Sequence, residues 1–369
     1  MYLRDNVNRD FKNIFRLVAT KVHFVHSSAG PGGMEILLPE IVKRFPEINF
    51  NAFVIRPNLK GRNVYENTNV EITYGHKRNL IVVFKLFIYV LKNRNEVFHV
   101  FNIGPLFLLM MKMSGAKKLI YSIHGTVYWK SPFKKKILHF LWQLSLSDRF
   151  KFTANSEFSK TVFLNKINPV QDIQVIFNTI DGKRFSPAAE TKISDDILVV
   201  YTGRLNEGKN LSKWIDIAFD IHSKIPRTRF EIYGQGPLET MLRNKISEMN
   251  AEKYIFLMGF HKDIENIYRK ADLLLFLSEY ESFGNVVVEC ILCGTPALVS
   301  PLPAMKEIFQ EFPEFVLGEE KDWNKQVYEG LLDLSELKKL SIKARSNFLN
   351  RFDYESNLNS LANIYAEFE

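Results

Sequence analysis

Cysteine is scarce in this sequence, and long apolar runs are absent from it. Its 369 residues include two cysteines, Cys290 and Cys293, which are too few to cross-link a secreted domain and favour a reducing compartment. The longest apolar-rich run, Leu80–Leu91, is interrupted by Lys85 and is shorter than the ~20 residues that span a bilayer. The chain does not open on a signal-peptide pattern. We therefore expect a cytoplasmic protein without a transmembrane anchor.

Acidic residues are also scarce in the first half of the chain. Residues 1–185 contain 28 Lys and Arg against 12 Asp and Glu, whereas residues 186–369 contain 21 against 29, and the formal net charge is +8. A basic half joined to an acidic half predicts an anionic partner for the first half, either a membrane surface or a nucleic acid. The sequence has no recognised nucleic-acid-binding module, so no nucleic-acid partner is expected.

Basic and aromatic side chains are interleaved in residues 128–143, YWKSPFKKKILHFLWQ. Lysines beside aromatic residues on an amphipathic helix are typical of a segment that binds an anionic bilayer surface. A helix with an ordinary solvated basic face is the alternative. Residues 1–20 precede the first expected strand and are expected to form a terminal extension. Peripheral attachment to the inner face of the cell membrane is therefore a further expectation.

Short apolar runs rich in β-forming residues alternate with helical patterns twice along the chain. In the first series the expected strands are Lys21–Ser27, Phe50–Ile55, Val97–Asn102, Leu119–His124, Phe150–Asn155 and Gln174–Asn178, and the expected helices include Met34–Phe45, Leu80–Asn93 and Pro132–Ser145. In the second series the expected strands are Ile197–Thr202, Arg229–Tyr233, Tyr254–Met258, Leu273–Ser278 and Ala297–Ser300, with helices that begin near Leu211, Pro237, Ile264, Gly284 and Ala304. This alternation predicts an α/β protein with two doubly wound, Rossmann-like parallel sheets.

A stretch without periodicity, Asp181–Asp196, separates the two series and is typical of a linker. We expect an N-terminal domain at residues 1–185 and a C-terminal domain at residues 186–350. Residues 351–369 carry a further helical pattern. Ligands of doubly wound folds bind at the carboxyl ends of the strands, so two facing domains would create a binding cleft.

The segment Gly203–Asn210, GRLNEGKN, lies between an expected strand and an expected helix. Backbone N–H groups at a helix start, together with Arg204 and Lys209, predict an anion site that suits phosphates. The spacing of its glycines and lysine is also that of a P-loop, but Asn210 stands where a P-loop has the hydroxyl that binds Mg²⁺. A P-loop phosphotransferase and a plain polar turn remain alternatives.

Two other glycine loops, Gly30–Gly33 and Gly234–Pro237, also follow expected strands. Neither completes the G-x-G-x-x-G pattern, because the third glycine position is occupied by Glu35 in one and by Glu239 in the other. This weakens the case for a dinucleotide-dependent oxidoreductase. Each loop still allows a backbone to approach a ligand closely, or is a simple turn between a strand and a helix.

The segment Ser278–Pro296, SEYESFGNVVVECILCGTP, is the strongest pattern in the chain. It places Glu281 in the loop after an apolar strand and Glu289 inside the helix that begins near Gly284. A carboxylate that accepts two hydrogen bonds suits a vicinal diol such as that of ribose. Either glutamate alone would be read as a solvated surface residue. Glu289, however, has apolar neighbours on both sides, so its carboxylate needs a partner.

Two weaker patterns favour structural roles when taken alone. Cys290 and Cys293 form a C-x-x-C, but they lie inside the expected helix, not at the N-terminus where a redox thiolate is stabilised, so buried packing is expected. His124 ends an apolar strand and precedes Gly125, which is more often a structural arrangement than a functional one.

The combination of motifs resembles the E-x₇-E signature of the retaining nucleotide-sugar glycosyltransferases of family 4, which have the GT-B fold. The resemblance covers most of the chain. It includes the N-terminal glycine loop, His124-Gly125, the run Asn178–Asp181, GRLNEGKN, GQGPL and MGFHKDIENIYRKADLLL. Two features depart from the family's pattern. The run NTID replaces the more usual N-G-[IV]-D before the linker, and Pro39 lies within the first expected helix, which it would bend.

The resemblance implies a role for each matching residue of the second half. Arg204 and Lys209 would neutralise the diphosphate of the donor, and Glu289 would bind the ribose of its nucleotide. Glu281 would hold the hydroxyls of the donor sugar. The backbone amides of Phe283, Gly284 and Asn285 would assist Glu281, and Gly236 of GQGPL would lie against the donor.

The resemblance also implies roles for two residues of the first half. His124 would contact the transferred sugar near the reacting centre and act in catalysis together with Arg204, Lys209 and Glu281. Gly33 would approach the diphosphate or the acceptor. The last helix would return to the N-terminal domain, as it does in the family.

The function implied is that of a retaining hexosyltransferase with a nucleotide sugar as cosubstrate, a UDP- or GDP-sugar being expected. The acceptor would be a glycan or a lipid-linked glycan in cell-surface polysaccharide or glycoconjugate synthesis. No D-x-D motif is present to hold a metal, so no metal is expected and basic side chains would stabilise the departing diphosphate. Two alternatives stay open, a P-loop phosphotransferase at Gly203–Asn210 and a non-catalytic polysaccharide-assembly scaffold with the same fold.

Overall fold

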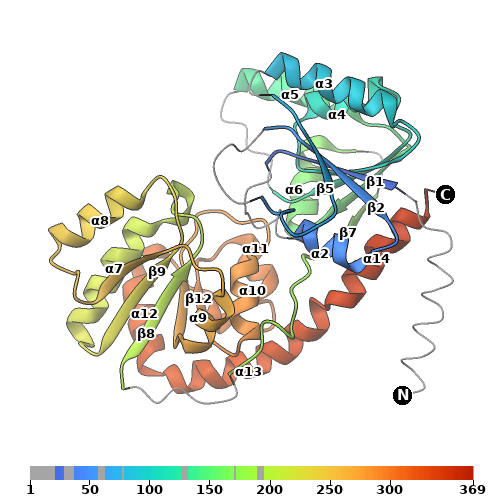
Figure 1. The fold of residues 1–369 in the computed structure, drawn as a ribbon. Helices are drawn as coiled ribbons and strands as arrows, with labels where there is room; N and C mark the ends of the chain where they lie inside the picture. The colour runs from blue at the N-terminus through green and yellow to red at the C-terminus, as the bar shows by residue number, and fades with distance from the viewer. Residues whose placement is uncertain are drawn as a thin grey trace, which may run out of the picture. The chain divides into compact units, whose positions relative to one another are not determined.

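A computed structural model describes residues 21–28, 37–56, 63–76, 79–125, 132–169, 172–188 and 195–368 of the chain. The chain divides into two compact units. Unit 1 comprises the described residues up to Thr179 together with those from Glu355 onward, and unit 2 comprises Ile180–Tyr354. Each unit contains one parallel β-sheet with helices packed against it (Figure 1).

Unit 1 is built on a seven-stranded parallel sheet with the order β3-β2-β1-β4-β5-β6-β7. Its strands are β1 (Lys21–His26), β2 (Asn49–Val54), β3 (Glu71–Tyr74), β4 (Val97–Phe101), β5 (Lys118–Ile123), β6 (Phe150–Ala154) and β7 (Ile173–Val175). His23 of β1 pairs with Asn51 of β2 on one side and with Phe98 of β4 on the other. The strand order reverses between β1 and β4, which is the topological switch point of a doubly wound sheet.

Helices α3, α4 and α5 lie side by side in one layer of unit 1 (Figure 1). The described helices before the boundary are α2 (Leu37–Arg44), α3 (Asn79–Lys92), α4 (Pro105–Met113), α5 (Pro132–Ser145) and α6 (Glu157–Ile167). Apolar side chains of α3 to α6 form one buried cluster with alternate residues of the central strands, including Phe98 and Val100 of β4. Alternation is expected because successive residues of a strand point to opposite faces of the sheet.

The last helix, α14 (Tyr354–Ala366), packs against unit 1 through His99, the residue between Phe98 and Val100. The Nδ1 atom of His99 lies 2.7 Å from the hydroxyl of Tyr365, and its Nε2 atom lies 2.7 Å from the hydroxyl of Ser122. Both His99 and Tyr365 are buried. The last helix is therefore held against the sheet of the N-terminal unit, as expected.

Unit 2 is built on a five-stranded parallel sheet with the order β10-β9-β8-β11-β12. Its strands are β8 (Ile197–Thr202), β9 (Thr228–Tyr233), β10 (Ile255–Gly259), β11 (Leu273–Phe276) and β12 (Ala297–Val299). Its α-helices are α7 (Leu211–Lys224), α8 (Glu239–Glu248), α9 (Ile264–Lys270), α10 (Asn285–Leu292), α11 (Pro303–Ile308), α12 (Trp323–Leu332) and α13 (Leu334–Arg351), and its 3₁₀ turns are η2 (Glu207–Lys209), η3 (Pro313–Phe315) and η4 (Glu320–Asp322). Here the order reverses between β8 and β11.

The structure confirms the α/β class with two parallel sheets, and it adds elements that the sequence did not predict. These are the short edge strand β3 and the helices α4, α6, α12 and α13. Pro39 lies within α2 (Leu37–Arg44), the helix that the sequence expected it to bend.

Among the residues that the structure describes, none of the helices combines the length and the apolar character that crossing a bilayer requires.

Candidate functional site

Two of the expected site residues lie at the switch point of the unit 2 sheet. Lys209 belongs to the loop and 3₁₀ turn that follow β8, and Glu281 belongs to the loop that follows β11. Because β8 and β11 are neighbouring strands, both loops leave the sheet at the same edge and at the position where the strand order reverses. This is the place at which doubly wound sheets bind their ligands.

Lys209 and Glu281 are joined by a hydrogen-bonded ion pair between Nζ and Oε1. Both side chains are largely buried, with relative exposures of 21% and 16%. The Lys209 ammonium also lies 5.4 Å from the centroid of the Phe276 ring, which stacks on Tyr201. Burial and the nearby Glu281 carboxylate together raise the pKa of Tyr201. The pair therefore lies over the buried Phe276 ring, where the two loops meet.

The two loops are also joined through their backbones. The N–H of Glu279 donates to the carbonyl of Gly208 at 3.0 Å. A Cβ atom at Gly208 would lie 2.6 Å from the ring of Tyr280, so a larger residue there would have to displace this exposed side chain. Asn210 then takes a left-handed conformation with φ of 52° and leads into α7. The segment GRLNEGKN thus packs its turn at Lys209 against the loop that holds Glu281.

Gly203 and Gly234, which follow β8 and β9, let the loops of these two strands cross closely. Both have positive φ values, 146° and 148°, and a Cβ atom at Gly234 would lie 1.8 Å from the carbonyl oxygen of Gly203. A Cβ atom at Gly236 would lie 2.3 Å from the carbonyl oxygen of Leu205, which accepts a hydrogen bond from the N–H of Leu238. The glycines of GQGPL are therefore required for packing against the GRLNEGKN loop.

Glu289 lies in α10, where its carboxylate accepts a 3.2 Å hydrogen bond from the hydroxyl of Tyr268. The Tyr268 hydroxyl in turn lies 2.8 Å from the hydroxyl of Thr202, the last residue of β8. Burial raises the pKa of Glu289 to about 7, against the opposing effects of the Tyr268 hydrogen bond and the Arg184 charge. Glu289 is thus a carboxyl group that titrates near neutral pH.

The residues around Glu289 include an ion pair of Arg184 with Glu265. The Nη2 atom of Arg184 lies 2.9 Å from Oε2 of Glu265, and its Nε atom lies 3.2 Å from the same oxygen. Arg184 belongs to the segment expected to be a linker, and Glu265 belongs to α9. Their charges act on Glu289 in opposite directions, because Arg184 lowers its pKa and Glu265 raises it.

The loop before α10 is anchored by Phe283. This ring is 2% exposed and packs edge-on against Phe352, with the ring centroids 5.3 Å apart. Gly284 follows with φ of 98° and is the N-cap of α10, which begins at Asn285. A Cβ atom at Gly284 would lie 2.6 Å from the terminal methyl of Met305. These residues set the direction in which α10 leaves the loop that holds Glu281.

Arg204 is exposed at the start of the GRLNEGKN loop, where its carbonyl accepts a 3.1 Å hydrogen bond from the Tyr201 hydroxyl. Lys209 lies against Glu281, and Glu289 lies against Tyr268 in the same unit. Arg204 follows β8 on the same loop as Lys209, so the backbone places both cations at one edge of the sheet.

His124 lies in unit 1, immediately after β5. Burial lowers its pKa to about 4, so the imidazole is neutral near pH 7. Its ring lies 5.6 Å from that of Phe101, which stacks on His99 at 4.0 Å. Gly33, the remaining expected site residue, lies outside the described residues, as do residues 1–20 and residues 128–131 of the expected basic helix.

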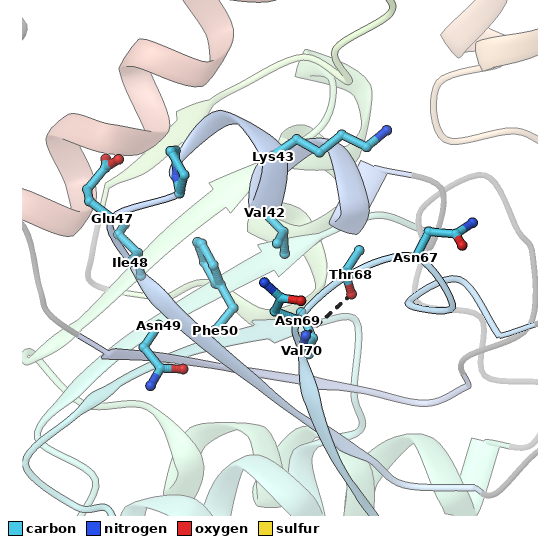
Figure 2. Close-up of a pocket in the computed structure, with 11 residues that line it drawn as sticks. Val42, Lys43, Glu47, Ile48, Asn49, Phe50, Asn67, Thr68, Asn69 and Val70 are labelled. Carbon is cyan, nitrogen blue, oxygen red and sulfur yellow. Dashed lines mark hydrogen bonds between the residues drawn. The ribbon is translucent and has the colours of Figure 1, made fainter.

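A hollow of about 470 Å³ lies elsewhere, in unit 1. It is lined by residues at the start of β2 and before β3, including Lys43, Phe50 and Val70 (Figure 2). Figure 2 shows the 3.4 Å hydrogen bond from the N–H of Val70 to the Thr68 hydroxyl at its edge. Because this hollow lies at the amino ends of the strands, it is not where the fold binds ligands.

Cys290 and Cys293 are free and buried, as expected. The thiol of Cys290 lies 3.4 Å from the carbonyl oxygen of Thr295, and burial raises its pKa well above the ordinary value. They therefore act as small core residues. Within the described ranges, no three His, Cys, Asp or Glu side chains gather in a way that could hold a metal ion.

Comparisons with known proteins address the activity of such a site. Residues 182–348 match the family model of glycosyl transferases group 1. The chain is 22% identical over 271 residues to the N-acetyl-alpha-D-glucosaminyl L-malate synthase of Bacillus anthracis, with 70% of each protein covered. It is 24% identical to the UDP-Gal:alpha-D-GlcNAc-diphosphoundecaprenol alpha-1,3-galactosyltransferase of Escherichia coli, with 79% of each covered. The chain is a glycosyltransferase.

The fold of this glycosyltransferase is that of known GT-B structures. Anabaena Alr3699/HepE, solved in complex with UDP and glucose, superposes with a TM-score of 0.78 at 20% sequence identity, covering 93% of this chain and 98% of that one. The group 1 domain at residues 182–348 falls within unit 2, which contains Lys209, Glu281 and Glu289.

Sequence reasoning missed Tyr268, Thr202 and Arg184 around the glutamates of this glycosyltransferase. Tyr268 stands inside the string MGFHKDIENIYRKADLLL, where a tyrosine in a short amphipathic helix looks like a core residue. Its hydroxyl reaches Glu289 because α9 packs against α10. One indication of this contact was present in the sequence: a tyrosine in the core needs a hydrogen-bond partner for its hydroxyl.

Proposed function

We propose that the enzyme is a retaining hexosyltransferase of family 4 that takes a sugar from a UDP- or GDP-sugar without a metal ion. The observation that carries this proposal is the Lys209–Glu281 pair at the switch point of unit 2, where a cation and a sugar-binding carboxylate lie side by side. The Anabaena structure was solved with UDP and glucose, and the E. coli relative uses UDP-Gal, which supports a nucleotide-sugar donor.

In this proposal each side chain has one task. Lys209 and Arg204 bind the diphosphate, whose negative charge grows as the glycosidic bond breaks, and preorganised cations lower the energy of that state most effectively. Glu289 accepts hydrogen bonds from the two ribose hydroxyls. Glu281 and the backbone amides of residues 283–285 bind the hydroxyls of the donor sugar, and Gly236 shapes the loop beside them.

Two residues of unit 1 complete the proposal. His124 is neutral near pH 7, so it can hydrogen-bond to the transferred sugar without adding a positive charge beside an oxocarbenium-like centre. Gly33 approaches the diphosphate or the acceptor. The new bond forms on the face that the leaving diphosphate vacates, with the leaving oxygen taking the proton of the acceptor hydroxyl, and this preserves the anomeric configuration.

The proposed acceptor is a glycan or a lipid-linked glycan used in surface polysaccharide or glycoconjugate synthesis. The E. coli relative acts on a diphosphoundecaprenol-linked acceptor, which supports this choice. We further propose that the enzyme works in the cytoplasm at the inner face of the membrane.

The deciding experiment has two stages. A thermal-shift panel of UDP-, GDP- and ADP-sugars identifies the donor, since a ligand of the folded state raises its apparent stability. Transfer is then followed by NMR with and without EDTA. A product with the anomeric configuration of the donor, formed at an unchanged rate in EDTA, is expected. An inverted product, or loss of activity in EDTA, would contradict the proposal.

The same assays address the two other readings of the sequence. A P-loop phosphotransferase needs Mg²⁺ and a hydroxyl after its lysine, where this chain has Asn210 in a left-handed conformation. A non-catalytic scaffold would bind no nucleotide sugar and would form no product.

A further inference from the structure

Apolar side chains are exposed over one layer of three neighbouring helices in unit 1, namely α3, α4 and α5. Helix α4 packs against both α3 and α5, and the three helices form one layer in Figure 1. Nine of the large apolar side chains that are exposed among the described residues lie on this layer. They are Leu80, Ile81, Phe84, Leu91, Leu106, Met113, Ile137, Phe140 and Leu144, which we call the α3–α5 face.

Helix α3 is apolar on two opposite sides. Val82, Leu86 and Val90 are buried at intervals of four residues and pack into the core. Leu80 and Phe84 follow the same spacing on the outward side and are 87% and 65% exposed. A surface helix of a soluble domain normally carries polar residues there. Exposed apolar side chains gathered on one layer of helices in this way mark a site of interaction with a protein or a membrane.

The charge around the α3–α5 face has a single sign. Helices α3, α4 and α5 contain no Asp or Glu. Between Glu71 and Asp148 the sequence has twelve Lys and Arg and one acidic residue, Glu96. Lys85, Lys92 and Lys136 are exposed on the same helices as the apolar residues. Apolar side chains surrounded by lysines are complementary to a bilayer with anionic headgroups.

Two helices of the α3–α5 face, α4 and α5, are joined by hydrogen bonds. The ammonium of Lys112 on α4 donates hydrogen bonds to the carbonyl oxygens of Leu144 and Leu146, at 2.9 and 2.5 Å. Lys112 therefore caps the end of α5 and joins the two helices. A preformed apolar surface loses little conformational entropy when it is buried, so binding is not opposed by folding of the segment.

We propose that the α3–α5 face is a membrane-docking surface, through which unit 1 inserts Leu80, Phe84 and Phe140 among the lipids of an anionic bilayer. A second copy of the chain fits less well, because a two-fold dimer through this face would bring its lysines against one another. The surface extends well beyond the basic helix expected at residues 128–143 and uses α3 and α4 in addition. The docking proposal is argued from the side chains of these three helices alone and does not depend on the proposed acceptor.

The test is co-sedimentation of the full chain with vesicles of phosphatidylcholine, with and without phosphatidylglycerol. We expect binding that requires phosphatidylglycerol, weakens with salt, and falls at least tenfold in the double variant L80S/F84S. The matched control is L332S/I342S, which removes two similarly exposed apolar residues from unit 2. A second pair, K85E/K92E against K253E/K343E, tests the charge, with about a fivefold loss expected for each lysine removed.

Donor binding, followed by thermal shift, keeps this test separate from the proposed function. L80S/F84S should bind nucleotide sugar as the unaltered chain does, and its unfolding temperature should not fall. Failure of the unaltered chain to bind anionic vesicles would overturn the docking proposal and leave the glycosyltransferase proposal untouched. The docking proposal is also wrong if L80S/F84S converts a dimer into a monomer while vesicle binding is unchanged, because the face would then be a subunit interface.

Discussion

Lys209 and Glu281 stand 72 residues apart in the sequence and form an ion pair in the structure. They meet because β8 and β11 are neighbours in the sheet although six elements of the chain, from η2 to α9, separate them, and each residue follows the carboxyl end of its strand. Under the proposed function both side chains bind the donor. Because the structure pairs this cation with this carboxylate, a bound donor would replace that contact with its own diphosphate and hydroxyls.

The first prediction distinguishes the role of Lys209, which is to bind the diphosphate, from that of Glu281, which is to bind the sugar. E281Q releases Lys209 from its partner, so UDP or GDP should bind at least as tightly as before while sugar transfer falls about 100-fold or more. K209A should weaken nucleotide diphosphate binding by about 1.5–3 kcal/mol, the range for a hydrogen bond to a charged group. Calorimetry and initial rates measure the two effects.

The control for this comparison is K338M, which breaks the ion pair of Lys338 with Asp272 in the same unit at 2.7 Å. It should leave both nucleotide binding and transfer unchanged. Equal losses of binding in E281Q and K209A would contradict the separate roles and would indicate that the pair only holds the loops together.

The second prediction follows from the pKa of Glu289, which burial raises from 4.5 to about 7. Between these values the unfolded chain carries a carboxylate while the folded chain keeps the proton. The contribution of this group to stability is therefore present at low pH and is lost as the pH rises towards 7. E289Q removes the titration, so it should be more stable than the unaltered chain by about 1–3 kcal/mol at pH 8 and equal to it near pH 4.

Denaturant unfolding at several pH values measures this difference. The exposed Glu279 supplies the control variant E279Q, which should show no such pH dependence of its effect. If E289Q were less stable at pH 8, the carboxylate would be stabilised by contacts that outweigh its desolvation. Under the proposed function E289Q should also lose nucleotide affinity, so this residue would weaken the fold in exchange for ligand binding.

The third prediction concerns proton release on donor binding. Ribose hydroxyls donate to a carboxylate, so a nucleotide selects the deprotonated form of Glu289 and lowers its pKa. Near pH 6.5 binding should release up to about one proton, and affinity should fall as the pH decreases from 8 to 6. Calorimetry in two buffers of different ionisation enthalpy counts the proton.

Y268F sharpens this measurement, since it removes the hydroxyl that stabilises the Glu289 carboxylate and should move the pH midpoint of binding upward. The control Y328F removes a hydroxyl from α12 and should leave the midpoint unchanged. Binding without a pH dependence would show that ribose is not held by Glu289.

How far the sequence predicts this structure depends on the element. The strands of unit 2 are predicted to within two residues, because each is a short run of mostly β-forming or apolar residues that a loop follows. β3, with the sequence EITY, was not predicted, since a half-exposed edge strand of four residues has no clear alternation. α4, PLFLLMMKM, was not predicted either, because an apolar stretch without spaced polar residues has no helical period.

The candidate site was likewise predicted from the sequence only in part. Glu281 and Lys209 belong to recognisable motifs, but their pairing depends on the strand order of the sheet, which no local pattern contains. The raised pKa of Glu289 follows from burial by tertiary packing. The hydrogen bond between Tyr268 and Glu289 likewise requires α9 to lie against α10. Neither segment's own sequence predicts that contact.

The last prediction is that unit 1 is the acid-sensitive part of the molecule. Burial lowers the pKa values of His23, His26 and His124 to about 4, and that of His99 well below its usual value of 6.5. These side chains stay neutral in the fold, whereas the unfolded chain takes up a proton on each below pH 6.5. Their contribution to stability is therefore complete above pH 6.5 and is lost as the pH falls towards 4. Each should cost about 1–2 kcal/mol at pH 5.

Hydrogen exchange resolved by segment measures this loss between pH 7 and pH 5. Protection should fall first in β1, β4 and β5, which carry or precede these histidines, while the strands of unit 2 keep theirs. H99Q should reduce the pH slope of unit 1 stability by about one proton even though it lowers stability at pH 7, since Gln does not titrate. Y365F, which removes the hydroxyl 2.7 Å from His99, should lower stability by about 1–3 kcal/mol with the slope retained. Equal loss of protection in both units on acidification would contradict the assignment to the buried histidines.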